Sequence, residues 1–142
     1  MNARRFTLAT LVATAALAAA GCGMMERMTG TMSVPLSGRE EVPPNASPGS
    51  GTAKVDLDGA VLKWTVTYSG TTGPVTAGHF HGPAPAGANA GVALPFTGSM
   101  ASPIVGQATL TPAQIDQLKQ GLWYVNLHTA AHPGGELRGQ VK

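Results

Sequence analysis

The stretch TAKVDLDGAVLKWTVTYSG, residues 52–70, decides the fold. Apolar side chains alternate with polar ones in both of its halves, and successive side chains of a strand point to opposite faces of a sheet. The pattern therefore predicts two β-strands, each with one buried and one solvent-facing side. Between them, Asp58 and Gly59 are typical of a hairpin turn that needs positive φ angles. The apolar set is Ala53, Val55, Leu57, Leu62, Trp64, Val66 and Tyr68.

Short segments of similar character continue on both sides of this hairpin. Turn residues recur about every eight to twelve positions, a spacing typical of a sandwich or barrel. One helix is expected in residues 111–121, where Thr111 can cap the first turn, Pro112 suits the first helical position and Gly121 can end the helix. We therefore predict an all-β domain: an antiparallel β-sandwich of about eight strands, immunoglobulin-like or superoxide-dismutase-like, with one short helix. The further strands are expected in residues 33–38, 74–82, 92–96, 103–110, 122–128 and 136–141.

Residues 1–21 have the composition of a secretory signal peptide. Two arginines precede an uncharged, Ala-rich stretch that is too short for a membrane span, and small residues follow it. The sequence AAGC, which ends at Cys22, resembles the lipobox of bacterial lipoproteins, although Ala19 stands where that motif usually has Leu. We therefore expect Cys22 to carry a lipid and residues 22–32 to form a tether. Ordinary cleavage that leaves a free thiol is the alternative.

The charge of the mature chain gives no sign of a nucleic-acid-binding face. The full sequence has nine basic and seven acidic residues, and two of the basic ones, Arg4 and Arg5, lie in the expected signal peptide. Because the remainder is balanced in charge and the chain is exported, we expect no nucleic-acid partner. We expect a periplasmic or cell-surface protein that is held to the membrane through its N-terminal lipid. Cys22 is the only cysteine, so the domain has no disulfide and depends on its core or on a ligand for stability.

All four histidines lie directly before or within the two richest Gly segments of the sequence. His79 and His81 are one residue apart in an expected strand, so their rings share a face. His128 lies at the end of the next-to-last expected strand, and His132 follows in a turn. If these two strands are neighbours, the four imidazoles can converge on one ion.

Imidazole nitrogen is a common ligand of both copper and zinc. Four nitrogens in a tetragonal array favour Cu(II), whereas a tetrahedral set suits Zn(II). We therefore predict a transition-metal site, with copper as the first candidate and zinc as the second. The alternative is structural, because the backbone groups of loops rich in Gly and Pro need hydrogen-bond partners that a histidine or asparagine can supply.

Five blocks of the sequence resemble, in order, the successive blocks of the CHRD domain, a module named for chordin and common in secreted bacterial proteins. The blocks cover most of residues 33–142, which we take as the domain. The resemblance implies an extracytoplasmic β-domain whose biochemical role is poorly defined, and it supplies no catalytic mechanism. The blocks are LSGREEVPP, GTAKVDLDG, GPVTAGHFHGPAPAGANAG, LTPAQIDQLKQG and LWYVNLHTAAHPGGELRGQV.

Two charged residues inside these blocks, Glu41 and Arg138, are expected to form a partly buried pair that ties the first loop to the last strand. The planar guanidinium of arginine matches a carboxylate, which favours such a pair. The alternative is two ordinary exposed charges. Asn126, on the same strand as His128, and Glu136, beside Arg138, are expected to support the site.

Catalytic motifs are absent from the sequence: it has no nucleophile elbow, no evident carboxylate pair and no phosphate loop. We therefore expect a non-catalytic, extracytoplasmic CHRD-domain lipoprotein with a histidine metal site. A first alternative is an interaction module that binds an envelope or extracellular protein without metal. A second is a copper enzyme like superoxide dismutase, which shares the sandwich and an H-x-H strand. The sequence shows no bridging histidine, no disulfide and no arginine near the site, and a shared fold is not evidence of activity.

Overall fold

The computed structural model describes residues 30–142, so the expected signal peptide and Cys22 lie outside the described residues. The predicted fold class is confirmed, because this part of the chain is all-β with eight antiparallel strands and one short α-helix. No helix within it is long and apolar enough to cross a membrane. In chain order the elements are β1 (Met32–Ser37), the 3-10 helix η1 (Gly38–Glu40), β2 (Ser50–Asp58), β3 (Val61–Ser69), β4 (Val75–His81), β5 (Val92–Pro95), β6 (Ile104–Thr109), α1 (Pro112–Lys119), β7 (Trp123–Thr129) and β8 (Leu137–Val141).

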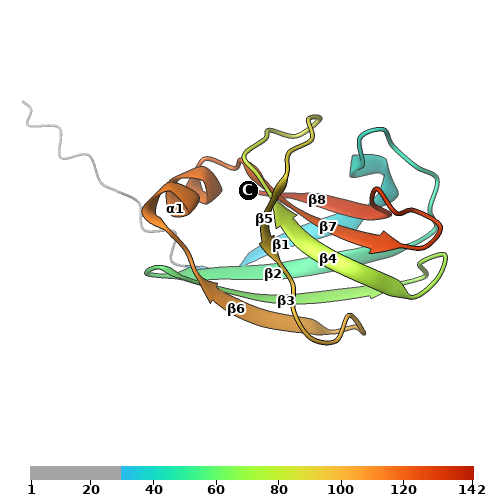
Figure 1. The fold of residues 1–142 in the computed structure, drawn as a ribbon, viewed down its shortest axis with the longest axis horizontal. Coiled ribbons are helices and arrows are strands. Elements are labelled where there is room, and N and C mark those ends of the chain that lie inside the picture. Colours follow the sequence, from blue (N-terminus) through green and yellow to red (C-terminus); the bar gives the residue numbers. More distant parts are fainter. Residues whose placement is uncertain (1–29) are drawn as a thin grey trace, which may run out of the picture.

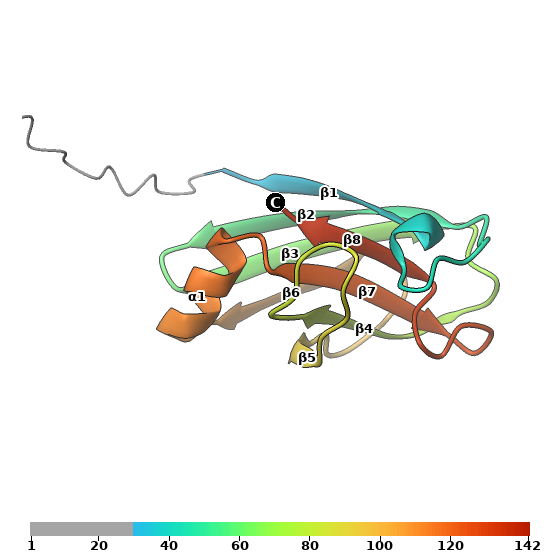
Figure 2. The ribbon, with the colours of Figure 1, turned by 90° about the horizontal axis from the view of Figure 1, so that it is seen from above.

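All eight strands belong to one sheet, in the order β5-β4-β7-β8-β1-β2-β3-β6. The sheet curls, so that the half containing β4, β7 and β8 faces the half containing β2, β3 and β6, as Figures 1 and 2 show. The join between the two halves is narrow, since the register of β1 with β8 pairs only Ser37 with Arg138. The predicted sandwich is therefore built from one folded sheet, and its two edges are β5 and β6.

The hairpin that decides the fold is formed by β2 and β3, whose register pairs Asp58 with Val61. Gly59 has a φ of 61°, and no residue other than glycine has a positive φ in residues 30–142. Asp58 therefore ends the strand and does not take the second positive φ expected of the turn. The alternation is confirmed, because the residues of the apolar set that the sequence predicts are buried, with Tyr68 partly so.

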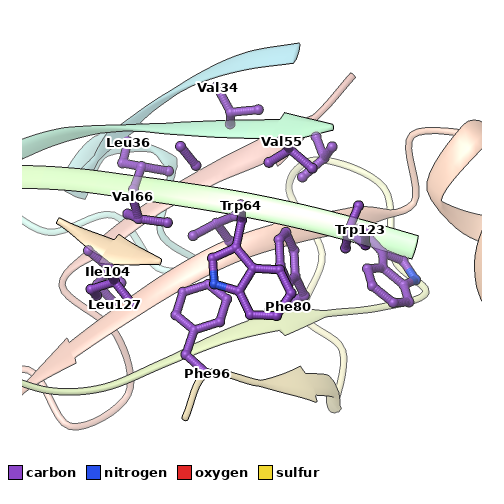
Figure 3. Packing of buried hydrophobic residues seen from close by; sticks show 14 of the residues in the cluster. Val34, Leu36, Val55, Trp64, Val66, Phe80, Phe96, Ile104, Trp123 and Leu127 are labelled. Atoms are coloured by element: carbon purple, nitrogen blue, oxygen red, sulfur yellow. The ribbon is translucent and has the colours of Figure 1, made fainter. Parts of the chain in front are cut away.

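Aromatic side chains fill the space between the two halves of the sheet (Figure 3). Trp64 from β3 stacks on Phe96 with ring centroids 5.3 Å apart, and Phe80 from β4 meets both rings edge-on. Burying a side chain of this kind contributes about 1.5–3 kcal/mol. Two glycines leave the room that these rings occupy: a Cβ atom at Gly106 would lie 2.4 Å from Trp64, and one at Gly78 would lie 2.5 Å from Phe96.

The predicted helix forms as α1 at one end of the sandwich (Figure 1). Thr111 and Gln114 form a capping box, in which each side chain accepts a hydrogen bond from the other residue's backbone N–H. Gly121, with a φ of 71°, follows the helix as expected. Trp123 Nε1 donates to Gln117 Oε1 at 3.1 Å, which fixes α1 against the start of β7.

Candidate metal centre

Three of the four histidines, His79, His81 and His128, belong to β4 and β7. These two strands are neighbours in the sheet (Figure 1). The register pairs His79 with Asn126, two residues before His128. Phe80, between His79 and His81, is fully buried in the core on the opposite face. The alternation of the two strands therefore gathers three half-buried imidazoles on one side of the sheet, as expected for strands that lie next to each other.

The ring nitrogens of His79, His81 and His128 are close enough to hold one metal ion. One ligand atom from each ring lies within 4.8 Å of the other two, and His79 Nδ1 lies 3.1 Å from His128 Nε2. Two nitrogens that bind one ion at about 2.0–2.1 Å lie roughly 2.8–3.4 Å apart for square-planar to tetrahedral angles. The spacing of this pair therefore suits a shared ion, and without an ion it suits a hydrogen bond between the two rings.

In two of these rings, the Nδ1 atom is hydrogen-bonded to a backbone carbonyl group. His81 Nδ1 donates to the Ala90 carbonyl at 2.9 Å, and His128 Nδ1 donates to the Pro133 carbonyl at 3.0 Å. A proton on Nδ1 leaves the Nε2 lone pair free, and contacts of this kind orient histidine ligands in metal sites. His81 Nε2 is buried and has no hydrogen-bond partner in residues 30–142, so its lone pair is available to an ion.

The same two hydrogen bonds are the contacts that the structural alternative requires. His81 anchors the loop that follows β4, and His128 anchors the turn that follows β7. Each imidazole has two nitrogens, so a ring can hold a loop through Nδ1 and bind an ion through Nε2. The two interpretations of the histidines are therefore compatible in this fold.

The environment keeps the histidines of β4 neutral. Burial is the main cause that lowers the pKa of His79, and the neighbouring His128 and His81 lower it further. Burial is also the main cause that lowers the pKa of His81. The Ala90 carbonyl opposes this lowering, whereas the charges of His128 and Arg138 add to it. Both rings are thus neutral at pH 7, which is the form that binds a metal ion.

His132 lies outside this cluster. It belongs to the turn between β7 and β8, where its backbone exchanges hydrogen bonds with Thr129 and accepts another from the Gly135 N–H. There it lines a surface pocket together with Glu41 and the first loop. Because β7 ends at Thr129 and the chain turns away, the structure brings together three of the four histidines that we expected to converge.

The expected ion pair between Glu41 and Arg138 is not formed in the described structure, although both side chains are buried. Arg138 donates to the Ala88 carbonyl at 2.7 Å and to Asn89 Oδ1 at 3.0 Å. Asn89 Nδ2 in turn donates to the Val42 carbonyl at 2.9 Å. The last strand is therefore tied to the first loop through Asn89, because the loop after β4 supplies the partners that satisfy the guanidinium.

Glu41 is bonded to Asn126 instead, whose side-chain amide donates to Glu41 Oε1. Burial raises the pKa of Glu41 to about 7, against the opposing effects of the Asn126 hydrogen bond and the Arg138 charge. Gly135 is required beside this contact, because its φ is 132° and a Cβ atom there would lie 2.6 Å from Glu41 Oε1. Asn126 thus holds the first loop against β7.

Glu136 is fully buried and joins three segments of the chain at the same end of the sandwich. Its carboxylate accepts hydrogen bonds from Ser47 Oγ, from the N–H and Oγ1 of Thr72, and from Thr129 Oγ1. Burial raises its pKa, but the hydrogen bonds from Ser47, Thr129 and Thr72 outweigh burial and lower the pKa to about 2. Sequence reasoning anticipated support from Glu136 but missed Ser47 and Thr72, which lie 89 and 64 residues away.

Tyr124 is a neighbour of the cluster that sequence reasoning did not single out as a site residue. Its ring stacks on His81 with centroids 5.0 Å apart, and the guanidinium of Arg138 lies 3.5 Å from its centroid. The structure therefore corrects the expectation that no arginine lies near the histidines. The available signal was the spacing of two between Tyr124, Asn126 and His128, which places all three on one face.

The fold and the site together define a small antiparallel β-domain with a surface cluster of three histidines. The chain belongs to the CHRD-domain family, because the family model for this domain matches residues 32–141. CHRD domains are non-enzymatic modules that generally occur in extracellular or secreted proteins. Comparison with curated proteins and with solved structures gives no match.

Proposed function

We propose that this chain is an exported, non-catalytic CHRD-domain lipoprotein that binds a transition-metal ion through His79, His81 and His128. The observation that carries the proposal is His81 Nε2, a buried nitrogen that has no hydrogen-bond partner among residues 30–142. It belongs to a cluster of three imidazoles whose ligand atoms lie within 4.8 Å of one another. A buried polar atom is costly unless a partner satisfies it. One bound ion would satisfy this nitrogen together with its two neighbours.

Copper is the first candidate ion and zinc the second. Cu(II) exceeds Zn(II) in affinity for sites of a given ligand set, and imidazole suits both. Three imidazoles with one open coordination position are also a common zinc set. The cluster contains no cysteine or carboxylate, so water or another external donor would complete the coordination.

Isothermal titration calorimetry of the tag-free mature chain with Cu(II) and with Zn(II) tests the proposal. We expect one ion per chain with a micromolar or tighter Kd. Replacement of both His79 and His81 by Ala should weaken binding by about 100-fold or more, since two of the ligands are lost. His132→Ala is the matched control and should bind normally. Absence of micromolar binding, or binding indifferent to the double replacement, would overturn the metal site.

The proposal also includes removal of residues 1–21 and a lipid on Cys22, and the AAGC sequence supports both. The lipid would hold the domain at the periplasmic or outer surface of a membrane. In cells fed an alkyne-labelled fatty acid, the wild-type protein should carry the label and sediment with membranes. Cys22→Ser should lose the label, whereas Met24→Ser should keep it. An unlabelled, soluble wild-type protein would contradict the anchor.

One observation favours an interaction module as a second candidate function. β6 is an edge strand that pairs with β3 along its whole length without a bulge, carries neither charge nor proline, and exposes 65% of Val105. Bulges, charges and prolines normally keep an edge strand from pairing with other chains. An edge strand without them can pair with an extended segment of another envelope protein. A photoreactive residue at position 107 should then give one defined adduct in cells that Val105→Lys abolishes. Adducts that survive this replacement would exclude the edge as the interface.

A further inference from the structure

Residues 82–91, which we call the strap, connect β4 to β5 and are fixed onto the outer face of the sheet. Figure 2 shows this segment crossing β7 beside β8. Tyr124 Oη accepts a hydrogen bond from the Ala90 N–H at 3.0 Å and lies 3.2 Å from the Ala90 carbonyl, to which it donates. Arg138 holds Ala88 and Asn89, as described above. The strap is thus attached by side chains of β7 and β8.

One strap atom is shared between this attachment and the histidine cluster. The Ala90 carbonyl accepts hydrogen bonds from both Tyr124 Oη and His81 Nδ1, at 3.2 and 2.9 Å. The orientation of the His81 ring and the position of the strap therefore depend on the same backbone group. A change in the strength of one hydrogen bond to this carbonyl affects the other.

The rings themselves form a stack of three groups. The Tyr124 and His81 planes are within 5° of parallel. Because β7 lies between β4 and β8, the guanidinium of Arg138 covers the other face of the Tyr124 ring, 3.5 Å from its centroid. The stack fixes the plane of the His81 ring, and the Ala90 carbonyl fixes which nitrogen it turns toward the strap. His81 Nε2 is consequently held in a buried position where the described part of the chain offers it no hydrogen-bond partner.

We propose that Tyr124 is a positioning residue for the metal centre and that the strap is coupled to metal binding through the Ala90 carbonyl. This inference rests on the proposed metal site. When His81 Nε2 binds an ion, the Nδ1–H becomes a stronger hydrogen-bond donor, and the bond to Ala90 tightens. Binding therefore strengthens the attachment of the strap, and by thermodynamic reciprocity an attached strap strengthens metal binding.

Amide hydrogen exchange with and without saturating Zn(II) tests the coupling in the mature chain. Zinc should slow exchange of the Ala90 amide by about 10-fold, a typical coupling between two linked events. Amides of residues 97–102, in the loop between β5 and β6, should not respond. If calorimetry shows that zinc is bound and Ala90 exchange is unchanged, the coupling is wrong while the metal site stands. If zinc does not bind at all, the proposed function itself has failed.

Tyr124→Phe tests the positioning role, because it keeps the stacked ring and removes only the hydroxyl group. We expect the Kd for Zn(II) to rise by about 10-fold, as for other outer partners of a ligating histidine, and the zinc-dependent slowing at Ala90 to disappear. Tyr68→Phe is the matched control, since Tyr68 Oη donates to the Met100 carbonyl in the other half of the sheet. A purely structural role would lower the melting temperature of either variant without changing the Kd. Wild-type zinc affinity in folded Tyr124→Phe would overturn the assignment.

Discussion

Glu41 and Arg138 are both buried, yet each is satisfied by a different neighbour: Asn126 donates to Glu41, whereas Arg138 donates to the strap. The carboxyl group therefore lacks the direct cation that would keep it ionised. Its pKa rises to about 7 as a result of burial. The stability of the domain should consequently depend on the protonation of Glu41 in the neutral pH range.

Glu41→Gln should remove this dependence. The pKa of Glu41 in the folded chain, about 7, lies above its ordinary value of 4.5, so the stability that Glu41 contributes is present below pH 4.5 and is lost as pH rises to 7. Above pH 7 the variant should exceed the wild type by roughly 1–3 kcal/mol, with allowance for solvent screening. Urea unfolding of both proteins from about pH 4 to about pH 8 measures the difference between their free energies of unfolding. The pKa values of His79 and His81 are lowered, but the contribution of these two histidines is the same in both proteins and cancels in the difference. A difference that stays constant with pH contradicts the prediction.

Glu136→Gln should show the opposite pH dependence. The lowered pKa of Glu136, about 2 against an ordinary 4.5, means that the carboxylate stabilises the fold above pH 4.5 and loses this effect as pH falls toward 2. At pH 7 the variant should be less stable by about 2–4 kcal/mol, since an amide nitrogen cannot accept the hydrogen bonds of the hydroxyl groups. Unfolding curves should show that the difference in free energy of unfolding between the two proteins decreases as the pH is lowered. Asp116→Asn, a change of the same kind in α1, is the control.

Arg138→Met should destabilise the domain by about 2–3 kcal/mol, because the Ala88 carbonyl and Asn89 Oδ1 lose a charged donor and Tyr124 loses its cation. Double-mutant cycles identify the partner. The coupling free energy of Arg138→Met with Asn89→Ala should exceed its coupling with Glu41→Gln. The reverse order would mean that Glu41 and Arg138 form a direct pair in solution. An unchanged melting temperature would show that Arg138 has no structural role.

Metal should raise the melting temperature of the mature chain and a chelator should reverse the effect. Free Zn(II) at about 100 times its Kd stabilises the folded state by about 2.7 kcal/mol, which corresponds to a rise in melting temperature of roughly 10–20 °C, at about 4–8 °C per kcal/mol for a small domain. Differential scanning calorimetry with zinc and then with EDTA measures the shift. The protein with His79 and His81 both replaced by Ala should show no shift, and an equal shift in that variant would locate the stabilising ion elsewhere.

Local patterns in the sequence were sufficient to predict the strands, the helix and part of the site. The alternation in residues 52–70 marks a hairpin, Thr111 and Pro112 mark a helix start, and the spacing of His79 and His81 places two rings on one face. Each of these signals depends on residues only a few positions apart, so it does not depend on how distant segments of the chain pack.

Long-range contacts could not be predicted in the same way. No local pattern states that β8 inserts between β7 and β1, or that one sheet curls to form both layers. The choice of partner for a buried charge depends on which loop covers it, and for Arg138 that loop is the strap. The hydrogen bonds of Glu136 likewise join segments that meet only after the sheet has closed.

The position of β8 has a consequence for the order in which the domain can assemble. The first strand, β1, pairs with β2 and with β8, and β8 is the last strand of the described chain to be synthesised. A nascent or partly translocated chain that lacks Leu137–Val141 would therefore have two unjoined half-sheets with the edges of β1 and β7 open. Such intermediates tend to aggregate and close slowly, so the domain should acquire its fold only after Leu137–Val141 has left the machinery that makes or moves the chain.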